Sequence, residues 1–235
     1  MAEDGHRLIS ADYSQVELRI LAHVSGEQVL KDIFARGEDV HAATAAEMFG
    51  VSPADIDPGL RSKAKMINFG IVYGLSAFGL ADRLDIPKDE AGEFIDRYLG
   101  RFPKVREFIE TTVERATEEG HVTTLLGRRR RIPELRSRKW GTRSLGERLA
   151  VNTPIQGSAA DIIKVAMVRA RQALGDAGLS TRLVLQIHDE LLYEAPEAEV
   201  EAASEVVVHA MVDAHELDPP LAVDVGSGDN WLAAK

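Results

Sequence analysis

Short apolar runs near both ends of the chain follow the pattern of β-strands. Residues 6–12 (HRLISAD) form one such run, which ends at Asp12. Residues 181–187 (TRLVLQI) and 191–195 (LLYEA) form two more, and the tight connection between them predicts a hairpin. A closing strand is expected within residues 220–231 (PLAVDVGSGDNW).

The segment that follows Asp12 has the spacing of an amphipathic helix. Its apolar positions are Val16, Ile20, Leu21 and Val24. Gly26 is expected to end this helix. Ser14 and Glu17 fit the S-x-x-E pattern of a capping box, in which each side chain satisfies a backbone N–H at the helix start.

The middle of the chain is predicted to be mainly helical. Pro87 and Pro103 are expected at the first positions of two helices, where proline loses no hydrogen bond. Residues 121–135 alternate β-forming and polar side chains and predict a small ribbon or loop. Residues 144–174 read as helix again, with an interruption expected at Pro154.

The order of elements predicts an α+β fold. A strand is followed by a long helical insertion, the hairpin, an amphipathic helix over residues 197–217 and the closing strand. This order indicates an antiparallel sheet with flanking helices, and the large insertion forms a second lobe. Asp12 would end one strand and Asp189 would lie at the hairpin turn, so the two carboxylates could be neighbours in one sheet.

Composition narrows the class of protein. The chain has 235 residues, of which 45% are hydrophobic, enough for one substantial core or two modest ones. The absence of cysteine excludes disulfides and thiolate metal sites and fits a reducing compartment. The polar N-terminus does not have the pattern of a secretory signal, and no apolar run is long enough to cross a bilayer. We therefore expect a soluble, cytoplasmic protein.

Charge is unevenly distributed along the chain. The net charge is −10, but residues 128–148 contain eight Arg and one Lys against two Glu. That window therefore carries +7 and the remaining residues carry −17. Because salt screening confines the field of such a stripe to about 10 Å, it can bind phosphates on an otherwise acidic protein. A solvated arginine loop is the alternative.

Three consecutive ionisable residues, His188, Asp189 and Glu190, stand between two apolar runs. An aspartate in a tight turn is ordinary, since its side chain can bond to nearby backbone. A bound divalent cation would relieve the repulsion between neighbouring carboxylates, and Mg²⁺ prefers oxygen ligands. Asp12 and Asp189 are the pair that could share such ions.

Arg61, Lys65, Phe69 and Tyr73 recur every four residues, so all four lie on one broad face of a helix. The rise from Lys65 to Tyr73 is about 12 Å, which matches the reach from a triphosphate to a stacked base. An amphipathic helix with exposed cations and a buried aromatic stripe is the alternative. Arg148, Asn152 and Gln156 form a similar polar row, whose amides could contact the minor-groove acceptors that every base pair presents.

Taken together, these stretches resemble the family A DNA polymerases, the DNA polymerase I group. DYSQVELR is similar to the first palm motif of the family, RSKAKMINFGIVYG to its fingers helix and QIHDELLYE to its second carboxylate motif. RLAVNTPIQGSAADIIK and the terminal GDNW also match, in the same order, over nearly the whole chain. Several long motifs in order are far more specific than any one of them.

The resemblance implies a DNA-directed DNA polymerase that adds dNTPs to a primer 3′-hydroxyl, in DNA replication and repair. Asp12 and Asp189 would bind two Mg²⁺ ions, and Lys65 and Glu190 would complete the catalytic set. Glu190 would tune the metal site from beside it, and His188 would contact the primer terminus.

The resemblance also implies roles for residues outside the carboxylate pair. The triphosphate would be bound by His41, Arg61 and Lys65. Phe69 would pack on the sugar, Tyr73 would lie near the base, and Glu17 would exclude a ribose 2′-hydroxyl. Primer-template DNA would be contacted by Arg148, Asn152, Gln156, His188, Arg128 and Arg129.

In the terms of that family, residues 1–25 and 146–235 would be palm and residues 26–145 fingers. The upstream palm, the thumb and the exonuclease domains are expected to lie outside these 235 residues. A separate chain could supply the missing thumb and upstream palm. The fingers motif of the family usually begins with two arginines, whereas here Ser62 follows Arg61.

Three alternatives remain open from the sequence. A single-subunit RNA polymerase has a similar palm and fingers helix, although Glu17 and the NFGIVYG form of the fingers helix favour deoxynucleotides. A fragment that binds nucleic acid without catalysis is the second. A two-metal nuclease is the third; it would need the paired carboxylates but no triphosphate helix.

Overall fold

The computed structural model describes the backbone of all 235 residues and every side chain except that of Pro53. The chain forms two compact units. The first, which we call the sheet unit, combines Met1–Glu17 with Ala159–Lys235, and the second, the helical unit, comprises Leu18–Ser158. The borders between the units fall inside two helices, α1 (Val16–Ser25) and α8 (Trp140–Asp176).

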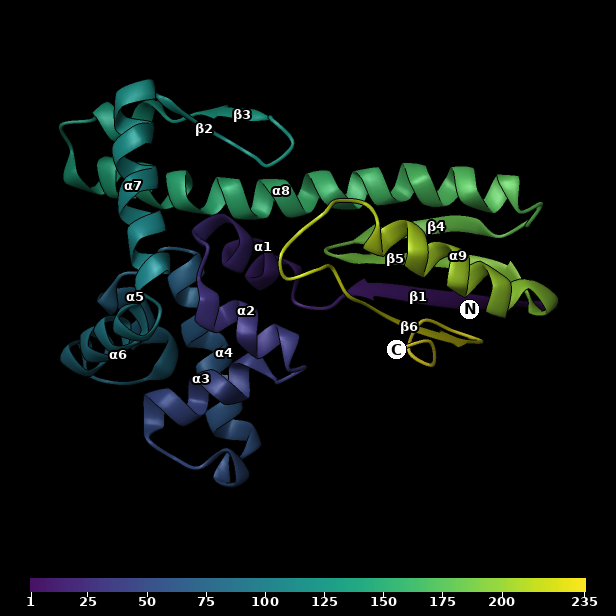
Figure 1. The fold of residues 1–235 in the computed structure, drawn as a ribbon, viewed down its shortest axis with the longest axis horizontal. Helices are drawn as coiled ribbons and strands as arrows, with labels where there is room; N and C mark the ends of the chain where they lie inside the picture. Colours follow the sequence, from purple (N-terminus) through teal and green to yellow (C-terminus); the bar gives the residue numbers. More distant parts are fainter. The chain divides into compact units, whose positions relative to one another are not determined.

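The sheet unit is built on an antiparallel sheet in the order β4-β5-β1-β6. The strands are β1 (His6–Tyr13), β4 (Arg182–Ile187), β5 (Glu190–Pro196) and β6 (Val223–Gly228). β1, at the N-terminus, pairs with β5 on one side and β6 on the other (Figure 1). The predicted antiparallel sheet with flanking helices is thus confirmed, and β1 extends one residue past Asp12.

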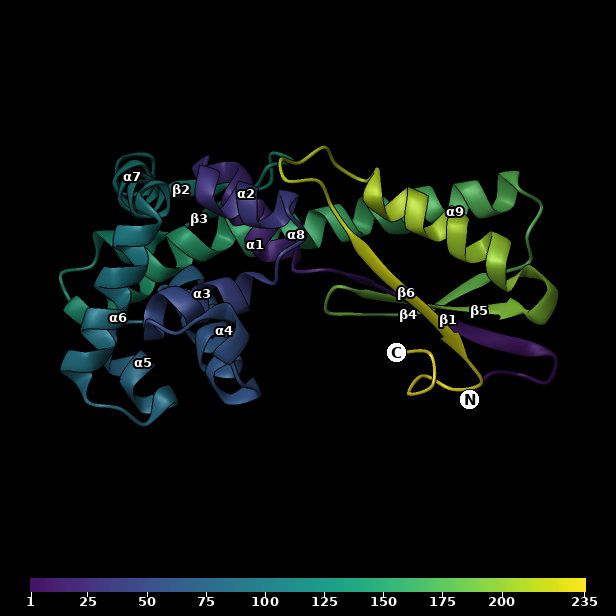
Figure 2. The same ribbon diagram turned by 60° about the horizontal axis from the view of Figure 1, so that its bottom comes forward.

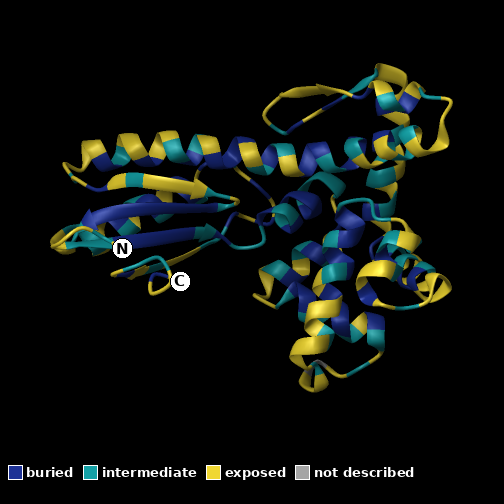
Figure 3. Cartoon of the chain, turned by 180° about the vertical axis from the view of Figure 1, so that it is seen from behind, coloured by how far each residue is buried: buried dark blue, intermediate teal, exposed yellow. Residues whose placement is uncertain are grey.

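The inner strands carry the core of the sheet unit. β5 is buried along almost its whole length, whereas β4, at the edge, is largely exposed (Figure 3). After the short turn η3 (Glu197–Glu199), α9 (Val200–Val212) packs on β1 and β6. The Tyr13 hydroxyl donates to Met211 O at 2.7 Å and ties this helix to β1. The part of α8 beyond Ser158 runs along the sheet in both ribbon views (Figures 1 and 2).

The helical unit contains the predicted long insertion. Its helices after α1 are α2 (Gln28–Ala35), α3 (Val40–Phe49), η1 (Pro53–Asp55), α4 (Pro58–Val72), α5 (Ala77–Leu84), α6 (Lys88–Arg101), α7 (Pro103–Glu119) and η2 (Pro133–Arg136). A ribbon of β2 (His121–Thr123) and β3 (Arg129–Arg131) follows α7, as predicted. Asp39 and Asp57 cap the N-termini of α3 and α4, which places both helices at defined starting points.

Two local predictions are corrected. α8 continues through Pro154 as one helix of 37 residues. Its hydrogen-bond ladder is supplemented nearby by the Ser158 hydroxyl, which donates to Pro154 O. The N–H of Ser14 donates to Ala222 O and α1 begins at Val16, while the capping box of Ser14 and Glu17 stays a prediction. Pro87 precedes the first residue of α6, so it is a cap and not the first helical position.

Within the described part of the chain, no helix combines the length and the apolar character that a bilayer span requires.

Candidate active-site residues of the two units

Asp12 and Asp189 come together in the sheet unit. The N–H of Tyr13 donates to Asp189 O at 3.2 Å, so the hairpin turn lies against the end of β1. His188 adopts a positive φ of 53° in this two-residue turn between β4 and β5. Antiparallel pairing also places Asp12 opposite Glu190 on one side and Asp224 on the other. Four carboxylates from three strands and a turn therefore gather at one end of the sheet.

The environment of Asp12 favours a cation. Burial, together with the negative charges of Asp189, Glu190 and Asp224, raises the pKa of Asp12 to about 6, although Lys235 opposes the shift. Asp12 Oδ1 is buried and has no hydrogen-bond partner among the described residues. A divalent cation would satisfy this oxygen and relieve the repulsion, so the donor set fits hard ions such as Mg²⁺. The described residues do not include a cluster of three or more His, Asp or Glu in metal-binding geometry, so solvent or substrate oxygens would have to complete the coordination.

Glu190 is occupied by partners within the chain. Its side chain is buried, 4% exposed, and Oε1 accepts from the Ser10 hydroxyl at 2.7 Å and from the Trp231 indole N–H. Lys235 Nζ lies 3.0 Å from Oε2. Burial alone would raise the pKa of Glu190, but these hydrogen bonds and the Lys235 charge outweigh it and hold the pKa below its ordinary value. Glu190 is thus an ionised, anchored carboxylate beside Asp12.

The other two predicted residues of the sheet unit differ in exposure. His188 is exposed, and its carbonyl accepts from the Gln186 amide at 2.7 Å. Glu17 is half-buried in the first turn of α1.

The four-residue row on α4 forms as predicted. Arg61 and Lys65 are exposed, and Phe69 stacks on Tyr73 with ring centroids 5.8 Å apart. Tyr73 is the residue that ends the helix. His41 joins the row from α3, with its ring 5.6 Å from that of Phe69. Cations followed by aromatic rings therefore lie along one surface of the helical unit.

Arg61 already has a partner inside the chain. Its Nε donates to Asp39 Oδ2 at 2.7 Å. The other oxygen of Asp39 caps α3 by accepting from the N–H groups of His41 and Ala42. An incoming phosphate would therefore have to displace Asp39 from the guanidinium.

His41 is fixed by a buried amide. Its side chain is only 3% exposed, and its Nδ1 lies 3.0 Å from Asn68 Nδ2, which also donates to the Thr44 hydroxyl oxygen. Because an amide N–H₂ can only donate, Nδ1 is the acceptor and the proton of the neutral ring is on Nε2. Burial lowers the pKa of His41 to about 4, with Arg61 and Lys65 adding to the effect and Asp39 opposing it. The ring therefore offers a neutral N–H donor.

In the polar row of Arg148, Asn152 and Gln156 on α8, two side chains are exposed and one is directed toward groups of the chain itself. Arg148 and Gln156 are exposed. With the amide of Asn152 turned so that its N–H₂ faces the two acceptors beside it, it donates to Val72 O at 3.0 Å and to Arg148 O at 3.2 Å and joins α8 to the last turn of α4. Gly74, with a φ of 64°, follows that turn; a Cβ there would lie 3.1 Å from Arg148 Cγ, which explains why a glycine is needed.

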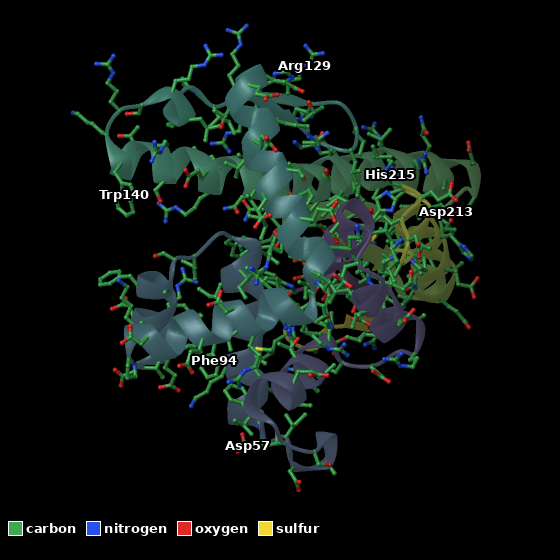
Figure 4. All side chains as sticks on the ribbon, turned by 60° about the vertical axis from the view of Figure 1, so that its left-hand side comes forward. Asp57, Phe94, Arg129, Trp140, Asp213 and His215 are labelled. Carbon is green, nitrogen blue, oxygen red and sulfur yellow. The ribbon has the colours of Figure 1, made fainter. Side chains whose placement is uncertain are left out.

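The arginines of the β2–β3 ribbon face solvent. Arg128 and all three residues of β3 are exposed. Figure 4 labels Arg129, which lies at the outer edge of the ribbon. Arg130 also donates to the Thr153 hydroxyl at 3.3 Å. The ribbon therefore presents a basic edge, as its composition predicts.

The sequence prediction missed the residues that support the site. Asp39 stands directly before the helical segment in EDVHAAT, and an aspartate at that position predicts an N-cap. Asn68 stands among apolar neighbours in MINFGIV, where a buried polar residue needs a partner. Trp231 ends the GDNW motif, but its contact with Glu190 and that of Lys235 arise only from the tertiary fold.

Comparisons with known proteins show which family the chain belongs to. The model of DNA polymerase family A matches residues 1–233. The chain is 50% identical over 235 residues to the thermostable DNA polymerase I of Thermus filiformis and 49% identical over 228 residues to DNA polymerase I of Bacillus subtilis. These matches cover 100% and 97% of this chain but 28% and 26% of the relatives. The chain thus spans about a quarter of their length.

A solved structure is also similar. The POL domain of Pol1 from M. smegmatis, in complex with DNA primer-template and dNTP, superimposes with a TM-score of 0.96 at 46% identity. The match covers 99% of this chain and 41% of that one. Because the family model matches nearly every residue, the chain belongs to DNA polymerase family A.

Proposed function

We propose that this chain is the fingers and C-terminal palm portion of a DNA-directed DNA polymerase that extends a primer by nucleotidyl transfer. Residues 1–25 and 146–235 would be the palm and residues 26–145 the fingers. The observation that carries the proposal is the meeting of Asp12 and Asp189 in a family A chain, where a buried oxygen of Asp12 lacks a partner. A similar domain has been solved with primer-template DNA and dNTP, which supports these two ligands.

Asp12 and Asp189 would hold two Mg²⁺ ions. The bound ions would neutralise phosphate charge and make the primer 3′-hydroxyl a better nucleophile. Glu190, anchored by its own partners, would lie beside Asp12 and tune the metal site. His188, exposed in the turn next to Asp189, would contact the primer terminus.

The nucleotide would be bound by residues of α3 and α4. Arg61 and Lys65 would bind the triphosphate by charge, and His41 would donate its Nε2–H to a phosphate oxygen. Phe69 and Tyr73, already stacked on each other, would contact the sugar and the base. Glu17 would exclude ribonucleotides by occupying the space of a 2′-hydroxyl.

Primer-template DNA would be bound by two groups of residues. Arg148 and Gln156 would contact the duplex from α8, while Arg128 and Arg129 would contact template phosphate from the ribbon. Asn152 would join them only if its amide exchanged the bonds to Val72 and Arg148 for contacts with DNA.

Primer extension with Mg²⁺ and the four dNTPs tests the proposal. We expect Asp189→Asn to lower the rate by roughly a hundredfold or more, because one metal-binding carboxylate is lost. Asp176→Asn, at an exposed acid at the end of α8, is the matched control and should leave the rate unchanged. Synthesis that survives the change at Asp189 would contradict the assignment. Equal use of NTPs and dNTPs would instead favour the RNA polymerase-like alternative.

A second candidate is a fragment that binds DNA without extending it. It is favoured by one observation, that Arg128 and the three arginines of β3 are exposed and could contact phosphate without the carboxylate pair. Electrophoretic mobility shift of a primer-template, measured beside extension, separates the two candidates. A shift without synthesis would favour the binding fragment, and addition of a polymerase segment that carries the thumb would then test whether synthesis is restored.

A further inference from the structure

The C-terminal segment Asp229–Lys235, which we call the C-terminal clamp, packs back on the sheet unit. A Cβ at Gly228 would lie 2.6 Å from the carbonyl carbon of Ala233, and one at Gly226 would clash with Ala234 O. Both glycines of β6 are therefore required for this close approach. Ala234 is buried with Leu8 and Leu192, and Trp231 packs against the same cluster. The clamp is thus an integral part of the sheet unit.

The clamp delivers two side chains to Glu190. Trp231 donates its indole N–H to Oε1, and Lys235 Nζ lies 3.0 Å from Oε2. The same ammonium lies 5.1 Å from the centroid of the Trp231 ring, so the two side chains also hold each other. With the Ser10 hydroxyl on Oε1, both oxygens of this buried carboxylate are bound. Glu190 has no need of a metal ion to be stabilised.

Lys235 also lies beside the carboxylates of the metal site. Its ammonium pairs with Glu190, which stands opposite Asp12 in the β1–β5 register and directly follows Asp189 in the chain. The acidic end of the sheet therefore contains one built-in cation. That cation offsets part of the field that would attract divalent ions.

We propose that Lys235 is a positioning residue and resident counter-cation of the metal site. It neutralises Glu190, reserves Asp12 and Asp189 for the divalent ions and limits the affinity of the site for them. The part that concerns metal affinity rests on the proposed function. Removal of the Lys235 charge, which lies beside the carboxylates, should tighten binding of a divalent cation by about threefold to tenfold at low salt.

Binding of Mn²⁺ to the full chain, without DNA or nucleotide, tests this inference. Mn²⁺ takes the same oxygen ligands as Mg²⁺, and the free ion is measured by electron paramagnetic resonance. Lys235→Met removes the charge and keeps an apolar stem over Trp231, and we expect its dissociation constant for Mn²⁺ to fall. Lys235→Arg keeps the charge and should restore the wild-type constant. Lys235 is more than half exposed, so both variants should fold.

The Mn²⁺ dissociation constants of the variants separate the role of Lys235 from the metal site itself. Tighter binding in Lys235→Met, with wild-type binding in Lys235→Arg, supports the role of Lys235. Unchanged or weaker binding in Lys235→Met overturns it, even where Asp12→Asn abolishes binding as the proposed function requires. If the Asp12→Asn variant binds Mn²⁺ as tightly as the wild-type chain, the metal site itself is refuted, and with it both proposals.

Discussion

At the scale of single residues, buried polar side chains define the chemistry that their exposed neighbours can offer. Asn68 is fully buried and directs an N–H toward His41 Nδ1, which leaves Nε2 as the donor. Asp39 holds Arg61 with one oxygen and the start of α3 with the other. The tautomer of His41 and the position of Arg61 are therefore fixed by Asn68 and Asp39, which would not themselves contact a nucleotide.

The buried His41 predicts an acid-sensitive stability. Its pKa is about 4 in the folded chain against an ordinary value of 6.5, so between these values the unfolded chain binds a proton that the folded chain does not. Stability should therefore fall as the pH drops from 6.5 to 4, by about 2–3 kcal/mol from this residue. Urea unfolding across this range should show a shallower fall for His41→Gln. A difference between wild type and variant that does not change with pH would contradict the assignment.

At the scale of elements, the close approaches require small residues. β6 admits the C-terminal clamp only because Gly226 and Gly228 lack side chains. A helix glycine such as Gly100 in α6 would have nothing within 4 Å of an added Cβ and carries no such requirement. The two kinds of glycine should respond in opposite ways to the same substitution.

Gly228→Ala should destabilise the sheet unit by about 1–3 kcal/mol, because the added methyl displaces the clamp. Gly100→Ala, the matched control, should stabilise α6 by roughly 0.5–1 kcal/mol, because alanine is the better helix former. The effect of Gly228→Ala is measured from the fluorescence of Trp231 during urea unfolding. The measurement uses a Trp140→Phe background, which removes the other tryptophan, a side chain that is 76% exposed. Equal unfolding midpoints for Gly228→Ala and its background would show that the clamp does not contribute to stability.

Periodicity predicted most elements correctly and tertiary contacts account for the rest. The strands, the hairpin turn and the row on α4 follow from local patterns that burial then reinforces. The interruption predicted at Pro154 was wrong, because a helix of 37 residues continues past the single backbone hydrogen bond that the proline removes. The support of Glu190 by Trp231 and Lys235 joins residues more than forty positions apart, and no local pattern contains such information.

At the scale of the whole molecule, charge is separated along the chain. The basic window over residues 128–148 stands against a net charge of −10, so nonspecific attraction to DNA should depend on that window. The three arginines of β3 belong to this window and are all exposed.

Arg129→Ala should weaken DNA binding at all sequences alike. If this side chain meets one phosphate, the slope of log K against log salt should become shallower by about 1. Arg83→Ala, at an exposed arginine of α5, is the matched control and should not change the slope. Fluorescence anisotropy of a labelled primer-template over a salt series measures both. Parallel salt plots for wild type and Arg129→Ala would exclude a phosphate contact.

The pairing of β1 has a consequence for synthesis of the chain. Ser10 and Glu190, which bond across adjacent strands, are 180 residues apart in sequence. At a translation rate of roughly 5–20 residues per second, β1 emerges about 10–40 seconds before its first strand partner. The ribosome-bound nascent chain must therefore carry an unpaired apolar strand while the helical segment behind it folds. A stalled chain that ends before β5 should be cut by protease near residues 8–13 but resist cleavage in α2–α7.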